Sequence, residues 1–322
     1  MISIVVCSRS KVLLENLKND IEHSIGVQYE LIVIDNSNNE YDIFKAYNLG
    51  VHQCKGNIIC FSHEDVKFHS KNWGQKVHNH FKDDDVGMIG VVGCTALPKV
   101  PAPWWNNQMI NYHLINLIQC WGDRQIPDGG YRKTFCEGKT IDYNNPEPKI
   151  NLHEAVTLDG LWFCIRKDLF SNISFDELTC PGFHCYDIDI SLQVGQFKKV
   201  AVVYDILIEH FSLGTLSQGW FLASLAFNKK WEGSLPKVLN NYDKQTYIQY
   251  EIECLLTFAY WMQSANFNDA LIKETIKYYL ILIERNNSLE YSILKRWSKY
   301  GYTLTRFIIK INKVLNSIIK NA

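Results

Sequence analysis

Residues 58–66 read IICFSHEDV, an apolar run that stops at three polar residues. The apolar part is short and contains β-branched and aromatic side chains, so residues 57–62 are predicted to form a buried β-strand. Two similar runs precede it, at residues 2–7 and 30–34. Polar residues follow all three runs directly, so each predicted strand delivers polar side chains at its carboxyl end.

Helical patterns alternate with the predicted strands. Residues 12–23 and 41–54 have the spacing of apolar residues that is typical of helices, and residues 86–92, 156–166 and 199–208 return to strand patterns. Strands that alternate with helices favour βαβ units and a parallel sheet, which is an α/β fold. Ligands of such sheets bind beyond the carboxyl ends of the strands, so the polar strand ends are the first candidate site.

Two other regions have a different character. Residues 98–150 are rich in Pro, Gly, Asn and Trp, and we expect a long irregular insertion that lines a site. From about Asp243 onward the pattern is helical only. We therefore expect an α/β domain over residues 1–232 and a helical C-terminal module over residues 233–322.

The composition is that of an ordinary globular protein. The 322 residues are 47% hydrophobic and 21% charged, and 33 Lys and Arg against 34 Asp and Glu give a net charge of −1. This balance excludes a disordered chain and gives no reason to expect nucleic acid as a partner. The ten cysteines form no CxxC pair, and neither a signal peptide nor a run of about 18 apolar residues occurs. These features favour a cytoplasmic location.

Three short clusters could carry chemistry. The first is residues 63–65, where an acid after a buried strand suits a divalent metal or a ligand hydroxyl, although a solvated turn has the same pattern. The second contains Asp187 and Asp189 at the start of a predicted helix, where carboxylates also favour the helix dipole. The third is His210 after a strand, where a single histidine is often structural. Each cluster alone is ambiguous.

Taken together and in order, these clusters resemble the family 2 glycosyltransferases, which have the GT-A fold. The resemblance covers roughly residues 1–230. Residues 2–9 look like the family's first nucleotide-binding strand, and residues 29–37 look like the second. Residues 58–66 match the strand that ends in the DxD motif, in a subset whose motif has the form His-x-Asp-Val.

The resemblance implies a Rossmann-like fold with a mostly parallel central sheet flanked by helices. It also implies an inverting, metal-dependent transfer of one sugar from a nucleotide-diphosphate donor to a glycan or lipid-linked acceptor, in bacterial surface polysaccharide or glycolipid synthesis. A divalent cation, Mn²⁺ or Mg²⁺, would stabilise the negative charge of the leaving diphosphate. The chain lacks the Q-x-x-R-W motif of processive members, which favours a single addition.

The resemblance also assigns roles to individual residues. Asp65 matches the usual metal ligand, and His210 is the second predicted ligand, with Mn²⁺ the more tolerant of imidazole. Asp187 matches the aspartate of the family's "ED" motif, the usual general base. Tyr186 replaces the glutamate of that motif, which leaves Asp189 as a second candidate for the base.

The remaining predicted residues contact the donor or the acceptor. The donor-binding set is Cys7, Ser8, Arg9, Asp35, Asn48, Glu64, Asp65, Asp159 and Gly160. The set predicted to form an acceptor or sugar platform is Trp104, Trp105, Trp162, Tyr186 and Asp189. The tryptophans have an alternative interpretation as core or loop-anchoring residues.

Two other functions remain open at this point. One is a nucleotidyltransferase, although such enzymes normally have a Gly-rich basic loop after the first strand. The other is a catalytically silent nucleotide-sugar or glycan-binding protein on the same fold, because His63 and Tyr186 depart from the family pattern.

The C-terminal residues 302–320 have a basic face and an apolar face at helical spacing. This pattern predicts a peripheral helix at an anionic membrane surface, at the inner face of the plasma membrane. The alternative is a helix that packs its apolar stripe on the core of its own module.

Overall fold

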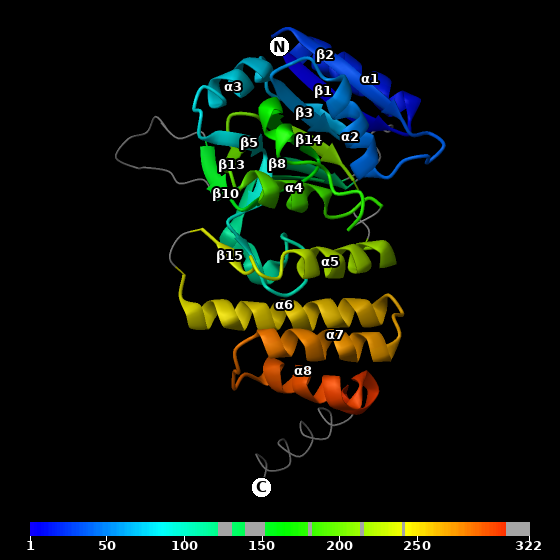
Figure 1. Cartoon of the computed structure of the whole chain (residues 1–322), viewed down its shortest axis with the longest axis vertical. Helices are drawn as coiled ribbons and strands as arrows, with labels where there is room; N and C mark the ends of the chain where they lie inside the picture. The colour runs from blue at the N-terminus through cyan, green and yellow to red at the C-terminus, as the bar shows by residue number, and fades with distance from the viewer. Residues whose placement is uncertain (122–130, 139–151, 180–181, 213–215, 240–241, 307–322) are drawn as a thin grey trace.

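The computed structural model describes most of the chain. The described residues are 1–121, 131–138, 152–179, 182–212, 216–239 and 242–306. A seven-stranded sheet lies at the centre of the N-terminal part, in the order β10-β13-β5-β12-β3-β1-β2 (Figure 1). Its strands are β1 (Ile2–Ser8), β2 (Tyr29–Asp35), β3 (Ile58–Ser62), β5 (Val86–Gly90), β10 (Leu152–Ala155), β12 (Trp162–Arg166) and β13 (Lys199–Val203).

The sheet is mixed rather than mostly parallel. Strand β1 runs parallel to β2 and β3, and β13 runs parallel to β5. Strand β12 is antiparallel to both of its neighbours, and β10 is antiparallel to β13. The expectation of a mostly parallel sheet is therefore wrong. Strand β12 enters from the short turn at residues 159–161 and not from a crossover helix, so nothing forces it to run parallel.

Helices cover both faces of the central sheet, which confirms the expected α/β fold (Figure 1). They are α1 (Lys11–Ser24), α2 (Ile43–Gln53), α3 (Trp73–His80) and α4 (Tyr186–Val194). Successive residues of β1 point to opposite faces. Ile4 and Val6 therefore share a core with α1 and α3, and Val5 shares the other core with α2 and α4. The side chains of Ser10 and Asp42 cap the starts of α1 and α2.

A second sheet extends the first toward the helical part. Its order is β11-β6-β8-β14-β4, and β9 pairs with residues 115–121 of β8. The strands are β4 (Val66–Phe68), β6 (Val92–Cys94), β8 (His113–Trp121), β9 (Tyr131–Glu137), β11 (Thr157–Leu158) and β14 (Ile208–Phe211), and the 3₁₀ helix η1 (Asn107–Tyr112) precedes β8. The expectation of an irregular insertion over residues 98–150 is therefore wrong for residues 107–121 and 131–137, whereas residues 98–106 are irregular as expected. Strand pairing of β8 with distant partners decides its conformation, and local composition does not reveal that pairing.

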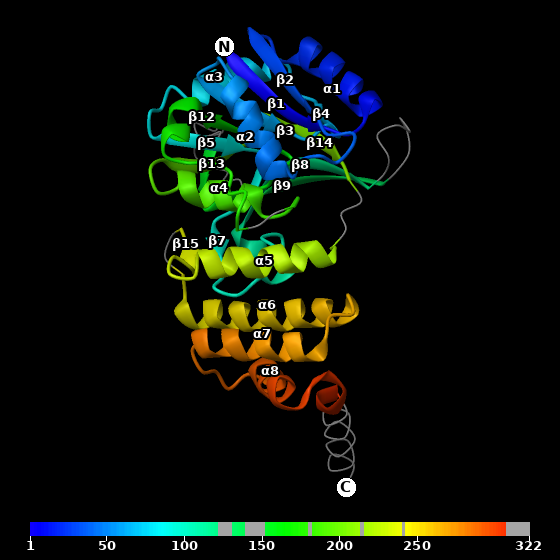
Figure 2. The same ribbon diagram turned by 45° about the vertical axis from the view of Figure 1, so that its right-hand side comes forward.

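Four helices form layers below the sheets (Figures 1 and 2). They are α5 (Gln218–Lys230), α6 (Lys244–Ser264), α7 (Asp269–Leu282) and α8 (Leu289–Tyr300). A core with Phe258, Ile276 and Trp297 joins the last three helices and also includes Phe221 of α5. Strand β15 (Lys237–Val238) pairs with β7 (Ala96–Leu97), which ties this part to the sheets. The predicted boundary at residue 233 stays a prediction.

Within the described ranges, which end at residue 306, no helix combines the length and apolar character needed to cross a bilayer. Of the predicted surface helix over residues 302–320, residues 302–306 are described and helical. Residues 307–320 lie outside the described residues, so that prediction stays as it was.

Candidate active site

A cavity of about 500 Å³ lies at the carboxyl ends of β1, β2 and β3, where the sequence predicts a site. We call it the β1–β3 cavity. Four predicted donor-binding residues line it, and they are Cys7, Arg9, Glu64 and Asp65. The guanidinium of Arg9 lies 6.0 Å from the centre of the Phe183 ring. Phe183 is not among the predicted site residues, although it opens the Phe-His-x-Tyr-Asp run that leads into α4.

Two further cavities continue from the first. The central cavity, of about 440 Å³, contains Asp159, Gly160 and Asp187. The aromatic cavity, of about 600 Å³, has walls that include Trp104, Trp105, Trp121 and Phe135. His63 borders both the β1–β3 cavity and the central cavity, and His210 borders both the central cavity and the aromatic cavity. Because they share these lining residues, the three cavities adjoin one another.

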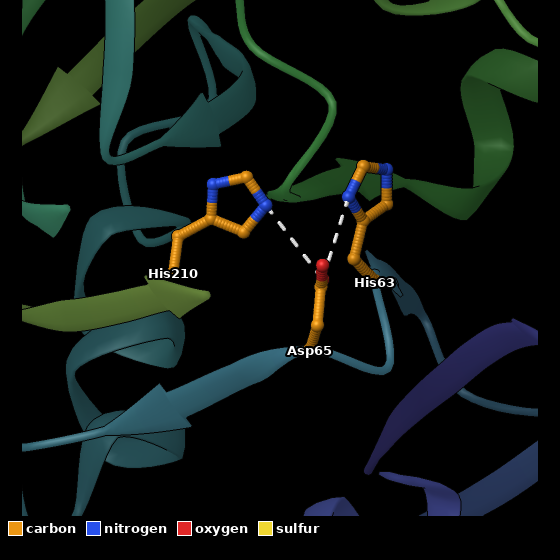
Figure 3. Close-up of side chains that lie close together, drawn as sticks. All are labelled: His63, Asp65 and His210. Atoms are coloured by element: carbon orange, nitrogen blue, oxygen red, sulfur yellow. Dashed lines mark ion pairs between the residues drawn. The ribbon is translucent and has the colours of Figure 1, made fainter. Parts of the chain in front are cut away.

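The side chains of His63, Asp65 and His210 point toward one another (Figure 3), and both histidines line the central cavity. Nδ1 of His63 lies 3.8 Å from Oδ1 of Asp65, and Nε2 of His210 lies 3.6 Å from the same oxygen. The three candidate ligand atoms all lie within 4.8 Å of one another. The predicted pair of Asp65 and His210 is thus brought together, and His63 joins it.

Backbone geometry explains this convergence. His63 and Asp65 lie in the short turn between β3 and β4, which brings their side chains to the same side. Strand β14 is antiparallel to β4 and pairs His210 with Val66, directly after Asp65. In the sequence, His63 stands out only as a departure from the DxD motif. Its spacing of two from Asp65 was the signal that it faces the same site.

The side chains of His63, Asp65 and His210 are chemically suited to bind a divalent cation. Oδ1 of Asp65 is buried and has no hydrogen-bond partner among the described residues. Two imidazole nitrogens and a carboxylate oxygen suit Mn²⁺ and related divalent ions. Burial lowers the pKa of His63 and so favours the neutral imidazole, the form that binds a metal. The other nitrogen of His210, Nδ1, lies 3.3 Å from Oε1 of Gln119, a contact that orients the ring.

Asp187, the predicted general base, borders the central cavity from the first turn of α4. Its Oδ2 accepts a hydrogen bond of 2.9 Å from the backbone N–H of Gly160. Burial and the nearby carboxylate of Asp159 raise the pKa of Asp187 to about 7. A carboxyl group with a pKa near neutrality can accept a proton efficiently at physiological pH.

The prediction of Asp189 as a second candidate for the general base is wrong. Two residues along a helix correspond to a rotation of about 200°, so Asp189 points away from the side that Asp187 faces. Its side chain is only 3% exposed and accepts a 2.8 Å hydrogen bond from Nε1 of Trp231. Nζ of Lys230 lies 2.7 Å from the same oxygen. Asp189 therefore anchors α4 to the end of α5 and cannot meet an acceptor.

The prediction of a sugar platform is also wrong for two residues, Trp162 and Tyr186. Trp162 is fully buried in β12, where its ring makes edge contacts with Trp73 and Phe68. A residue of a central strand faces packed helices on either side, so its ring is not accessible to a sugar. Tyr186 borders the central cavity, but it is only 3% exposed and packs its ring against Phe44 and Tyr47. Trp104 and Trp105 do line the central and aromatic cavities, as expected of a platform.

Five predicted donor-binding residues lie outside the lining of the β1–β3 cavity, and they are Ser8, Asp35, Asn48, Asp159 and Gly160. Nδ2 of Asn48 donates to the carbonyl of Phe175 at 2.9 Å, so Asn48 holds a neighbouring loop against α2. Asp35 is exposed, accepts a hydrogen bond from the backbone N–H of Ser37, and borders a separate smaller cavity with Ser8.

The same is true of the turn residues in the predicted set. Asp159 and Gly160 line the central cavity and not the β1–β3 cavity. Glu64 does line the β1–β3 cavity, but its carboxylate accepts hydrogen bonds from the hydroxyl of Ser8 at 2.7 Å and from the N–H of Arg9 at 3.2 Å. Glu64 therefore shapes the turn after β1.

Comparison with known proteins agrees with this geometry. The family described as "Glycosyltransferase like family" matches residues 3–242, about three quarters of the chain. The chain belongs to this glycosyltransferase-like family. The match includes both sheets and every residue of the His63, Asp65 and His210 cluster. The predicted enzyme class, a glycosyltransferase, is the class of this family.

The individual proteins that this chain resembles share little of its sequence. The streptomycin biosynthesis protein StrF of Streptomyces griseus is 26% identical over 172 residues, which are 52% of each protein, so the chain spans about half the length of this curated relative. A structure of GalNAc-T7 with UDP, GalNAc and Mn²⁺ is similar with a TM-score of 0.49 and 11% identity, over 95% of this chain and 57% of that one. A structure of S. aureus TarS with UDP-GlcNAc gives a TM-score of 0.41 and 13% identity, over 91% of this chain and 78% of that one.

Proposed function

We propose that this protein transfers one sugar from a nucleotide-diphosphate donor to an acceptor hydroxyl, with inversion at the anomeric carbon. One observation carries the proposal. The cluster of His63, Asp65 and His210 lies at the junction of the cavities, and Asp187, with a pKa near 7, borders the same central cavity as both histidines. A cation site for a leaving phosphate and a base for an incoming hydroxyl are the two groups that this reaction needs.

The β1–β3 cavity would hold the nucleotide. Its position beyond the ends of β1 to β3 is where sheets of this kind bind nucleotides. The positive charge of Arg9 favours phosphates, and the partly exposed ring of Phe183 offers a flat apolar face. His63, Asp65 and His210 would hold Mn²⁺ or Mg²⁺. When bound, this ion would stabilise the negative charge that develops on the leaving diphosphate.

Asp187 would act as the general base. In its ionised form the carboxylate takes the proton of an acceptor hydroxyl while the hydroxyl oxygen forms a bond to the anomeric carbon of the donor. The bond from that carbon to the phosphate oxygen breaks, and the nucleoside diphosphate leaves with the electron pair. Attack on the face opposite the leaving group inverts the anomeric centre.

The aromatic cavity would hold the acceptor. Trp104, Trp105 and Trp121 present aromatic surface suited to the apolar face of a sugar ring, and Gln119 and Lys133 supply polar groups for its hydroxyls. We propose a glycan or lipid-linked acceptor of bacterial surface polysaccharide or glycolipid synthesis. In this proposal the helix predicted over residues 302–320 brings the cytoplasmic enzyme to the membrane surface.

A donor screen tests the proposal. UDP-, GDP- and dTDP-sugars are added with Mn²⁺, and CMP-sugars, which carry one phosphate, serve as the control. We expect one diphosphate donor to raise the unfolding temperature of the protein by mass action. Without an acceptor, the enzyme should also hydrolyse this donor slowly and release the nucleoside diphosphate. Asp65→Ala should lose both effects.

Two results would contradict parts of this proposal. Full Mn²⁺-dependent donor binding by the Asp65→Ala variant would refute the cation site. Donor binding that no acceptor converts into turnover, with either soluble glycans or lipid-linked sugars, would favour a silent nucleotide-sugar-binding protein.

A further inference from the structure

The two residues that depart from the family pattern contact each other. His63 stands at the first aspartate of the DxD motif, and Tyr186 stands at the glutamate of the "ED" motif, 123 positions later in the chain. Nε2 of His63 lies 2.6 Å from the hydroxyl of Tyr186, which is a short hydrogen bond. The same hydroxyl lies 3.1 Å from the carbonyl oxygen of Gly160.

The number of available protons determines which atom donates and which accepts in each of these contacts. A carbonyl oxygen can only accept, so the contact with Gly160 uses the single proton of the Tyr186 hydroxyl. The hydroxyl oxygen is then left to accept a hydrogen bond from His63. With that proton on the Gly160 side, Nε2 of His63 carries the ring proton, and Nδ1 of the neutral ring has a free lone pair.

We propose that Tyr186 is a positioning residue that fixes the tautomer of His63 and thereby makes it the third ligand of the cation site. The inference rests on the proposed function. Nδ1 of His63 is the nitrogen that faces Asp65, at 3.8 Å from Oδ1 (Figure 3). In the opposite tautomer, Nδ1 would carry a proton toward the site and could not bind a metal. Hydrogen bonds to the distant nitrogen of a histidine ligand commonly fix the tautomer in this way.

The surrounding packing holds this arrangement in place. The ring of Tyr186 makes edge contacts with Phe44 and Tyr47, at centroid distances of 6.2 and 5.5 Å. The backbone of Gly160 approaches so closely that a Cβ atom built there would lie 2.0 Å from the Tyr186 hydroxyl oxygen. The hydroxyl is therefore confined between the carbonyl and the imidazole and has no alternative position without repacking.

The chain also offers a matched control. Tyr47 packs against the same ring and is buried, and its hydroxyl interacts with the hydroxyl of Tyr186 rather than with His63. Tyr186→Phe and Tyr47→Phe therefore remove the same atom from neighbouring rings. Only the first change removes a contact to His63.

The first measurement is made on the metal-free protein. Nitrogen-15 NMR of the His63 side chain reports which ring nitrogen carries the proton. We expect the proton on Nε2 in the wild type and in Tyr47→Phe, and a mixture of tautomers in Tyr186→Phe. A proton on Nδ1 in the wild type, or an unchanged tautomer in Tyr186→Phe, overturns the proposal.

The second measurement is calorimetric titration with Mn²⁺ alone. Loss of an outer-shell partner of a metal ligand commonly weakens metal binding by about 10- to 100-fold, and we expect this loss for Tyr186→Phe. In a double-mutant cycle, Tyr186→Phe should have no further effect once His63→Ala is present. Additive losses overturn the proposal even if one variant is partly destabilised.

The outcomes also separate this inference from the proposed function. Wild-type protein that binds no Mn²⁺ refutes the cation site and with it the role of Tyr186. Wild-type protein that binds Mn²⁺ with an affinity unchanged by Tyr186→Phe refutes only the role of Tyr186.

Discussion

Replacing Asp187 by Asn gives the sharpest test of the chemistry. The amide keeps the shape of the side chain and can still accept the hydrogen bond from the N–H of Gly160, but it cannot take a proton. Donor binding should therefore persist while the rate of transfer falls. Loss of a general base typically costs about 10²- to 10⁴-fold, and we expect a loss in this range.

The raised pKa gives the wild-type enzyme a specific pH dependence. With a pKa of about 7, roughly one-tenth of Asp187 is ionised at pH 6 and roughly nine-tenths at pH 8. The transfer rate should therefore rise about tenfold between these pH values in single-turnover reactions, which report the chemical step rather than product release. The residual rate of Asp187→Asn should lack this rise.

The same shift predicts an effect on stability. The folded protein holds this proton more tightly than the unfolded chain, so the ionisation of Asp187 opposes folding as pH rises from about 4 to 7. The slope is about 1.4 kcal/mol in the free energy of unfolding for each pH unit between the two pKa values. Asp187→Asn should lose this slope and become the more stable protein at pH 8.

Asp189→Asn is the matched control, because it makes the same chemical change two residues along α4. It removes the charge that pairs with Lys230, so it should lower the free energy of unfolding by about 1–3 kcal/mol and leave the pH dependence of transfer in place. The assignment of the base is refuted if Asp187→Asn transfers sugar at the wild-type rate while folded Asp189→Asn is inactive.

Three further predictions concern other parts of the molecule. Gly160→Ala would place a Cβ atom 2.0 Å from the Tyr186 hydroxyl oxygen, so it should weaken Mn²⁺ binding in a titration, whereas Gly233→Ala, with nothing within 4 Å, should not. Trp105→Ala should raise the KM for the acceptor several-fold in steady-state assays and leave donor affinity unchanged, because Trp105 is 42% exposed and lines the aromatic cavity. The intact chain should sediment with anionic but not neutral vesicles at low salt, and replacing the basic residues of 302–320 by Glu should abolish this.

Much of the site could be predicted because its residues follow elements that are encoded locally. Asp65 lies in the short segment after β3 and His210 lies in β14, and the resemblance of their order to the family's order was enough to predict them as a pair. Period-two alternation and helix caps act between near neighbours, so they remain visible in the sequence. The same local signals placed the strands and helices of the sheet.

The errors come from residues whose surroundings are assembled from distant segments. Trp162 looks like a binding residue beside Asp159-Gly160, but Trp73 and Phe68 enclose it. Asn48 looks like a ligand-binding amide, but it ties α2 to Phe175, which is 127 positions away. Sequence spacing does not show such enclosure.

The sequence by itself determined the α/β class and the polar strand ends, and through the family resemblance it indicated Asp65, His210 and Asp187 as candidate site residues. Tertiary structure alone decided which of two carboxylates in one helix turn lines the central cavity, and that His63 lies beside Asp65 and His210. The physical reason is the separation along the chain over which each interaction acts. Helix phase and strand alternation depend on neighbouring residues, whereas the roles of Asp187 and Asp189 depend on whether Gly160 or Trp231 meets each carboxylate across the fold.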